Sequence, residues 1–475
     1  MARSTWLTGT LGLAALAGPV LRGQGLDPAT FFQLAEQAQT AFSIQGDGAR
    51  AMGTGGAFIA IADDATAVSY NPAGLAQLLR PEASFGLQAL SRDQGFTGAT
   101  GNVAGSPTTF EDTTSRDRHV RPSFASFTLP WKQGGLNRAV LFSYQRIFDF
   151  TYGSSVNYLA KAAGGSTTQA IAQAIRQDGG IDLYSLAFAA ELSPRLLLGA
   201  SLNAWQGRWQ FTSTSQLVTS GISTVFDSTL GQSSAFRGVN GNLGLIWRSE
   251  YLNLGLVYRT PFTATYTFSN QYDHVDGTTG TPVQQGTPST PASVQWPGAL
   301  GWGLGLHLGP RVQVTADWVE TPWSRARYAG SGASLDGRNW FDNRVASAIP
   351  DVLDERGGIE WVALASGRLV VPLRAGVFRE PQPIVDDRTG QQRVLEGWTA
   401  GFGVKRGSVT LDVAYRQAHS RREASRLNTD APIGGVASVA YGFEQEDERK
   451  LYLSVIYQFK GAALQRALSW LLVGG

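Results

Sequence analysis

The chain has 475 residues, only 16 % of them charged, and its formal net charge is +2. A soluble protein of this length carries about a quarter charged residues, and a nucleic-acid-binding protein shows a basic face that this balance does not supply. Cysteine is absent, the histidines lack ligand spacing and no nucleophile–base constellation is visible, so we expect no enzyme, no metal site, no cofactor and no nucleic-acid partner.

Residues 1–23 have the organisation of a secretory signal. Arg3 supplies a positive charge, residues 6–16 are apolar, and small residues follow. Cleavage is expected after Ala17 or near Gly23. A buried helix is the alternative interpretation of this segment.

Residues 24–81 are predicted to form a small, turn-rich unit. An amphipathic helix is expected over 27–43, followed by a glycine-rich segment. Asp63 could cap a short helix over 65–70, and Asn71 then caps another helix with Pro72 at its first position. A compact unit in front of a strand array is typical of a plug, here called the hatch.

From residue 82 to 459 the apolar pattern has period two. Leu252, Leu254 and Leu256, for example, alternate with the small or polar residues Asn253 and Gly255. Such faces suit lipid outside and a lumen inside. Fourteen strands are predicted, near 82–91, 121–130, 138–150, 181–193, 195–211, 236–248, 251–268, 293–308, 311–325, 355–365, 368–379, 396–405, 408–420 and 448–459.

The connections between these strands alternate in length. Short turns alternate with long polar segments, which is the pattern of an outer-membrane barrel and not of a β-sandwich or propeller. The long connections are predicted at 92–120, 151–180, 214–235, 269–292, 326–354 and 421–447. Aromatic residues near strand ends, including Trp131, Trp205, Trp247, Trp302 and Trp323, are interpreted as interfacial belts.

The predicted fold is therefore an all-β membrane protein, a 14-stranded antiparallel transmembrane β-barrel plugged by a small N-terminal helical hatch. It is expected in the outer membrane of a Gram-negative-type bacterium. Residues 460–475 would form a C-terminal amphipathic extension, lying at the periplasmic interface or tucked into the barrel mouth.

Residues 61–76, IADDATAVSYNPAGLA, followed by Arg80 and Pro81, resemble the hatch of the FadL/TodX family of outer-membrane hydrophobic-compound transporters. Asn71-Pro72-Ala73 matches the Asn-Pro-Ala motif of that hatch. The likeness extends over nearly the whole mature chain, for example to 258–261, 317–324 and 373–378.

The resemblance implies passive transport of hydrophobic compounds, foremost long-chain fatty acids. The ligand, a fatty acid or aromatic hydrocarbon, would be captured by the loops, bound in the lumen, released by hatch rearrangement and passed sideways through the wall. The protein would be a monomer, with outer-membrane lipids and the barrel assembly machinery as further partners. The alternatives are a secretion-associated or structural barrel that binds a protein through its loops, and a polar-solute porin.

The gating residues implied by the hatch motif are Asn71, Pro72 and Ala73. In the third strand, strict alternation points Arg146 toward lipid, at a cost of about 2–4 kcal/mol. A bulge near Gln145 would turn Arg146 inward and kink the strand where the family's wall opening lies, which makes Arg146 a gating candidate. A strand that starts one residue out of phase is the alternative.

Candidate ligand-binding cations follow from the same parity. Arg259, Arg374 and Arg416 are expected to face the lumen, and Arg325 or Arg327 to do so near its outer rim. Arg208 resembles a ligand-binding arginine of the family, but it needs a bulge at Gly207 to point inward. A lumenal salt-bridge network is the alternative role for these arginines.

Overall fold

The computed structural model describes residues 46–103, 106–109, 112–161, 168–219, 222–275, 282–286, 290–330, 350–385, 389–433 and 436–460. The predicted signal, the helix expected over 27–43 and nearly all of the C-terminal extension lie outside these residues. Among the described helices, none is long and apolar enough to cross a membrane.

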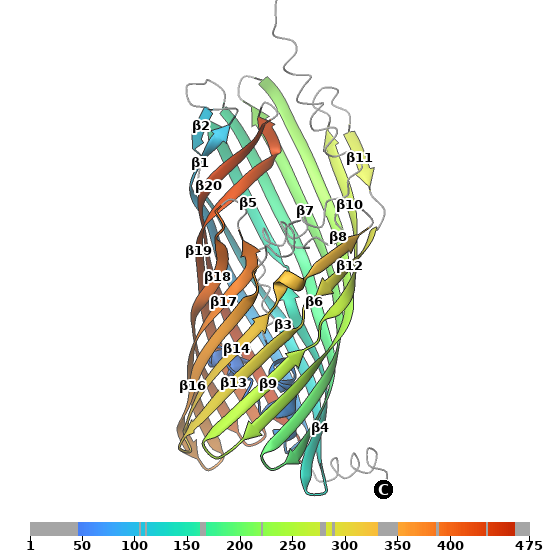
Figure 1. Ribbon diagram of the computed structural model, residues 1–475. Coiled ribbons are helices and arrows are strands. Elements are labelled where there is room, and N and C mark those ends of the chain that lie inside the picture. Colours follow the sequence, from blue (N-terminus) through green and yellow to red (C-terminus); the bar gives the residue numbers. More distant parts are fainter. Residues whose placement is uncertain are drawn as a thin grey trace, which may run out of the picture.

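One antiparallel sheet closes on itself to form a barrel (Figure 1). The first strand pairs with the last, from Glu82 opposite Gln458 outward. The wall has fourteen strands, as predicted. Eleven are continuous: β1 (Glu82–Val103), β3 (Thr113–Gln133), β4 (Leu136–Asp149), β6 (Thr168–Ser193), β7 (Leu196–Thr219), β8 (Ile222–Arg248), β16 (Val352–Ser366), β17 (Leu369–Val385), β18 (Gln392–Arg406), β19 (Val409–Ile433) and β20 (Val436–Gln458).

The other three wall strands are interrupted. They are β9 with β10 (Leu252–Arg259, Phe262–Val275), β12 with β13 (Thr290–Trp296, Ala299–Leu308), and β14 with β15 (Val312–Thr321, Arg327–Gly330), the last pair joined by η2 (Trp323–Arg325). Three short strands, β2 (Ser106–Thr109), β5 (Tyr152–Lys161) and β11 (Pro282–Gly286), pair with the outer ends of β1, β6 and β10.

The alternation predicted from the sequence sets the two faces of the wall. On β9, Leu254, Leu256 and Tyr258 are exposed on the outside, whereas Asn253 and Val257 are buried on the lumenal side. An apolar outer band is the surface that a bilayer requires of a barrel.

The strands are longer than the apolar pattern indicates. Most of the segments predicted as long loops continue the ladder: β7 runs to Thr219 and β8 starts at Ile222. The backbone hydrogen bonds of an antiparallel ladder are satisfied in water as well as in lipid. A strand therefore does not end where its outward side chains become polar.

Two neighbouring wall strands change phase where a proline interrupts them. Up to Arg259 the odd-numbered residues face the lumen, but from Phe262 the even-numbered ones do. The adjacent strand changes in the same way between Trp296 and Ala299. Pro261 and Pro297 lie in these breaks, because proline has no N–H to donate to the ladder.

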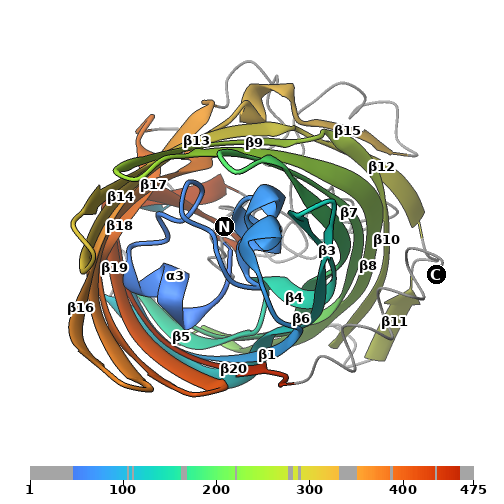
Figure 2. The same ribbon diagram turned by 90° about the horizontal axis from the view of Figure 1, so that it is seen from below.

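The hatch lies inside the lower part of the barrel, near the short turns, and fills much of the view from below (Figures 1 and 2). It consists of α3 (Ala49–Gly53), α4 (Ala67–Tyr70) and η1 (Pro72–Gln77) with the turns between them. Asn71 caps η1 as predicted, accepting a hydrogen bond from the Ala73 N–H. Asp64, and not Asp63, binds the Thr66 N–H before α4.

Candidate functional site

The Asn71 side chain fastens the hatch to the barrel wall. Its Nδ2 donates to the carbonyl oxygens of Leu245 on β8 (3.1 Å) and Leu256 on β9 (3.3 Å), and to Ile59 within the hatch (3.0 Å). The same side chain thus caps η1 and binds two wall strands.

Glycines in the wall let the hatch backbone come this close. A Cβ on Gly244 would lie 2.0 Å from the Asn71 Oδ1, and one on Gly199 would lie 2.3 Å from the Ala73 nitrogen. Neither contact leaves room for any residue except glycine. The Asn-Pro-Ala motif is therefore packed directly on β7 and β8.

Further anchors lie on the opposite wall. Asp317 of β14 accepts hydrogen bonds from the Phe58 N–H (2.5 Å) and the Ile59 N–H (2.8 Å). Thr399 of β18 donates to the Gly53 carbonyl (3.0 Å) and accepts from the Gly55 N–H. The hatch is held through its backbone from several sides.

The ladder between β3 and β4 stops part-way up the barrel. It runs from Gln133 opposite Leu136 to Phe124 opposite Gln145. Beyond that row, among the residues that the structure describes, β3 pairs with β1 alone, and the chain after β4 continues as β5, which pairs with β6 alone. We call the unladdered border between residues 113–123 and residues 146–161 the seam.

Bulges on both strands mark the start of the seam. The β1–β3 register shifts beside Pro122, and the β4–β6 register shifts between Arg146 and Phe148, which leaves Ile147 as the extra residue. Gly180 faces this bulge, and a Cβ there would lie 2.2 Å from the Phe148 carbonyl oxygen. A bulge is thus present in this strand, at Ile147 instead of near Gln145 as predicted.

Arg146 precedes the extra residue and keeps the outward phase of Tyr144. The extra residue follows Arg146 and does not reverse its phase, but the Arg146 side chain still lines the cavity on the inner side of the wall described below. Its Nε lies 2.7 Å from the Asp182 carboxylate, which also accepts a hydrogen bond from the Tyr144 hydroxyl (2.9 Å). This ion pair offsets the cost of placing the cation there.

Charged side chains bridge the seam where backbone hydrogen bonds are missing. The His119 Nε2 of β3 lies 2.6 Å from the Asp149 Oδ2 of β4. The Arg121 guanidinium lies 3.4 Å from the same carboxylate and 2.6 Å from that of Asp178 on β6. On the outer face beside them, Val120 is 67 % exposed. Ion pairs therefore hold the two sides of the seam together.

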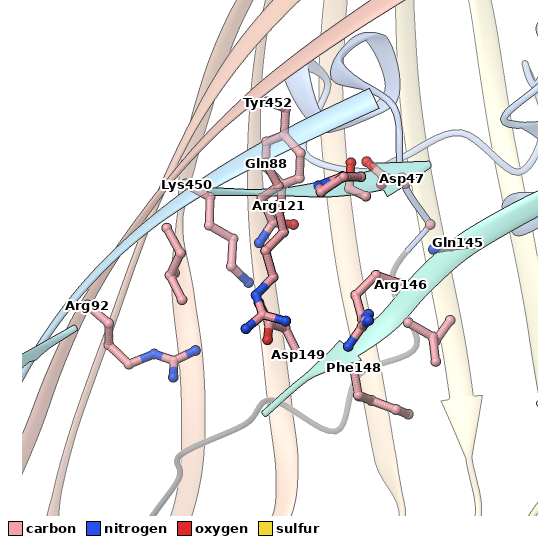
Figure 3. Close-up of a pocket in the computed structure, with 15 residues that line it drawn as sticks. Asp47, Gln88, Arg92, Arg121, Gln145, Arg146, Phe148, Asp149, Lys450 and Tyr452 are labelled. Carbon is pink, nitrogen blue, oxygen red and sulfur yellow. The ribbon is translucent and has the colours of Figure 1, made fainter. Parts of the chain in front are cut away.

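A cavity of about 80 Å³ lies on the inner side of the seam start (Figure 3). Its lining joins β1, β3, β4, β20 and the hatch: Gly46, Asp47, Gln88, Leu90, Arg92, Arg121, Pro122, Ser123, Gln145, Arg146, Ile147, Phe148, Asp149, Lys450 and Tyr452.

The hatch takes part in this cavity through two segments. Asp47 lines it, and burial raises the pKa of the Asp47 carboxyl. The Ser69 hydroxyl donates to the Gln145 side chain (2.6 Å). Asn71, Pro72 and Ala73 lie at β7 and β8 and do not line the cavity. A hatch movement would reach it through Asp47 and Ser69.

A large apolar cluster fills the side of the lumen formed by β4 to β12. We call it the aromatic cluster; its ring-bearing members are Phe148, Phe150, Trp205, Trp209, Phe236, Phe262, Tyr266, Phe268, Trp296 and Trp323. Trp296 is its centre, with ring centroids 5.2 Å from Trp323, 5.5 Å from Trp205 and 5.7 Å from Phe148. Trp205 and Trp323 are thus lumenal, not interfacial as predicted.

The side formed by β1 and β16 to β20 is ionic. Arg416 binds Glu448 (2.5 Å) and Glu380 (2.9 Å). Arg374 binds Asp412 (2.7 Å) and Glu360 (2.6 Å). Both arginines face the lumen as predicted, but their carboxylate partners favour the network role.

Arg259 also faces the lumen and differs from those two. The structure pairs it with no carboxylate among the described residues; its Nη2 donates to the Ser69 carbonyl of the hatch (3.2 Å). In sequence it lies between Gly255, which contacts Ile59 of the hatch, and Phe262 of the aromatic cluster. It is the candidate cation best placed for a lumenal ligand.

Two other candidate cations do not reach the lumen. The β7 register passes Gly207 without a shift, so Arg208 is exposed on the outer face. Arg327 lies opposite the outward Gln295 and donates to the carbonyls of Ser324 and Ala326. The predicted inward direction of Arg327 is therefore wrong, and the bulge that Arg208 would need is absent.

The aromatic cluster was missed partly because some of its members lie at proline-linked phase changes. Extending the alternation of 252–258 past Pro261 points Phe262 outward, whereas the structure points it inward. Proline inside a predicted strand was the available signal, at Pro122 as well as at Pro261.

No family model matches the chain, and no curated protein does. Several solved structures are similar to it in fold. A Pseudomonas aeruginosa FadL homologue aligns with a TM-score of 0.62 at 13 % identity, covering 88 % of this chain and all of that one. The P. putida toluene transporter TodX gives 0.54 at 13 %, and the Ralstonia pickettii toluene transporter TbuX gives 0.53 at 14 %, with the same coverage. The protein therefore has the fold of the FadL and TodX channels, a hatch-plugged, 14-stranded antiparallel barrel.

Proposed function

We propose that this protein is a passive outer-membrane channel for hydrophobic compounds, with long-chain fatty acids as its ligands. The observation that carries the proposal is the aromatic cluster, a packed group of apolar side chains inside the lumen of a barrel that is also apolar outside. The protein would act as a monomer in the outer membrane of a Gram-negative-type bacterium, inserted by the barrel assembly machinery.

The apolar part of the ligand would lie on the aromatic cluster. Burial of an acyl chain gains about 0.8 kcal/mol per methylene group. Arg259, which lies between this cluster and the hatch, would bind the carboxylate. Such a charge-assisted contact is stronger than a neutral hydrogen bond, so Arg259 would favour anionic ligands over neutral ones.

The seam would be the exit. An acyl chain that left through a water-filled pore would lose its apolar contacts, whereas sideways release into lipid keeps them. The seam starts beside the aromatic cluster and opens where Val120 is exposed outside. Movement of the hatch at Asp47 and Ser69 would precede release.

The test is uptake of radiolabelled oleate by a host that lacks its own outer-membrane fatty-acid transporter, with a neutral alkane of similar length as second probe. We expect the wild type to restore uptake of both. Arg259→Gln should lower oleate uptake more than alkane uptake, and Arg208→Gln, on the outer face, should change neither. No restoration by correctly inserted wild type would refute the proposal.

A further inference from the structure

We infer that Phe148 is the inner gate between the aromatic cluster and the seam cavity, and that it determines how bulky a transported molecule can be. The inference rests on the proposed transport function. It assigns a specificity-determining role to one ring of the barrel wall, separate from the hatch.

Phe148 is the member of the aromatic cluster that also lines the cavity. Its ring lies 5.7 Å from Trp296 and 6.4 Å from Trp205 on the lumenal side. Phe148 also lines the cavity that Arg121 and Lys450 border (Figure 3). Phe148 therefore joins the aromatic cluster to the cavity at the seam start.

The bulge explains why a ring occupies this position. Without the extra Ile147, residue 148 would continue the outward phase of Tyr144 and Arg146. With it, Phe148 points inward and is only 2 % exposed. The bulge at Ile147, which marks the start of the seam, therefore also places the Phe148 ring on its inner side.

The surroundings allow the ring to act as a gate. Its lumenal neighbours are rings stacked or tilted against it, an arrangement that is favourable but does not lock one geometry. On the other side is the cavity, of about 80 Å³. Rotation of the Phe148 ring toward this cavity would open the passage to the seam. A side chain of another size at this position would change the width of that passage.

Phe150 is the matched control. It stacks on Phe148 at 6.3 Å and is 3 % exposed, so it belongs to the same cluster. It does not line the cavity. Truncation of Phe150 removes an aromatic ring of the same size from the cluster without changing the passage to the seam.

The experiment compares initial uptake rates of oleate and of a fatty acid that ends in a pyrene ring system, in cells with matched surface levels of folded barrel. Folding is checked by the heat-modifiable electrophoretic mobility of the barrel. Phe148→Ala should raise the pyrene-to-oleate rate ratio about tenfold, and Phe148→Trp should lower it. Phe148→Leu should lie between wild type and alanine, and Phe150→Ala should keep the wild-type ratio.

The outcomes separate the two proposals. If the wild type restores uptake and Phe148→Ala leaves the ratio unchanged, the gate is refuted and the transport function stands. An equal rise in Phe150→Ala also refutes the gate, because loss of any cluster ring then suffices. If the wild type transports neither probe, the proposed function fails and the gate fails with it.

Discussion

Replacement of Asn71 by aspartate separates its two roles. Aspartate keeps the side-chain oxygen that accepts the Ala73 N–H, so η1 remains capped. It loses the amide that donates to the carbonyls of Leu245, Leu256 and Ile59. It also turns a carboxylate oxygen toward those carbonyl oxygens.

The amide has two protons, so it makes at most two full hydrogen bonds at once. Each contributes about 0.5–1.5 kcal/mol net, so their loss costs about 1–3 kcal/mol of hatch docking. Because about 1.4 kcal/mol corresponds to a factor of ten, the detached population should rise about fivefold to a hundredfold in Asn71→Ala. The buried charge in Asn71→Asp should raise it further.

The assay is amide hydrogen exchange of residues 49–78 in lipid nanodiscs, with wall strand β20 as internal reference. We expect exchange in the hatch to increase from wild type to Asn71→Ala to Asn71→Asp, and that of β20 to stay constant. If Asn71→Asp exchanges like the wild type, the side chain acts only as a helix cap, and the docking argument is refuted.

Further predictions concern the wall. Gly244→Val should displace the hatch and raise the ion conductance of single barrels in planar bilayers, because a Cβ at Gly244 overlaps the docked motif, whereas the outward Gly357→Val should not; equal conductance of the two variants would contradict this. The chain has no cysteine, so cysteines introduced in place of His119 and Asp149 can be cross-linked selectively with a short bifunctional maleimide. This cross-link should hold the seam closed and slow oleate uptake several-fold. Unchanged uptake by a fully cross-linked barrel would exclude the seam as the exit. Arg416→Met should lower barrel stability by about 1.5–3 kcal/mol in urea titrations, because Glu380 and Glu448 lose their shared partner but keep other contacts, Glu380 with Arg356 and Glu448 with Arg92 and Lys450; an unchanged midpoint would show that Arg416 does not stabilise the barrel.

Much of the fold follows from period-two alternation, because a wall residue has only two directions to face. The fourteen strands and the inward Arg259 were predictable for that reason. Alternation does not predict the positions at which the inward-facing residues change from odd to even numbers or back. Ile147 and the break at Pro261 each shift the phase by one residue, and Phe148 and Phe262 face the lumen as a result.

The seam was only partly predictable for a different reason. The pairing of two strands depends on both of them. The sequence of β3 alone, or of β4 alone, therefore does not show where their hydrogen-bonded ladder ends. The cost of an outward Arg146 indicated an irregularity in β4. The matching bulge beside Pro122 and the small residue Gly180 opposite become meaningful only when the strands are neighbours.

The seam lies on the border between the two halves of the lumen. On one side Arg92 and Lys450 belong to the ionic half, which holds water readily, and on the other Phe148 belongs to the aromatic half, which excludes it. An amphiphile that arrives at this border can keep its charged end hydrated while its apolar end stays dry. The seam therefore lies where an amphiphilic molecule can pass from the lumen to the bilayer while its charged end stays hydrated and its apolar end stays out of water.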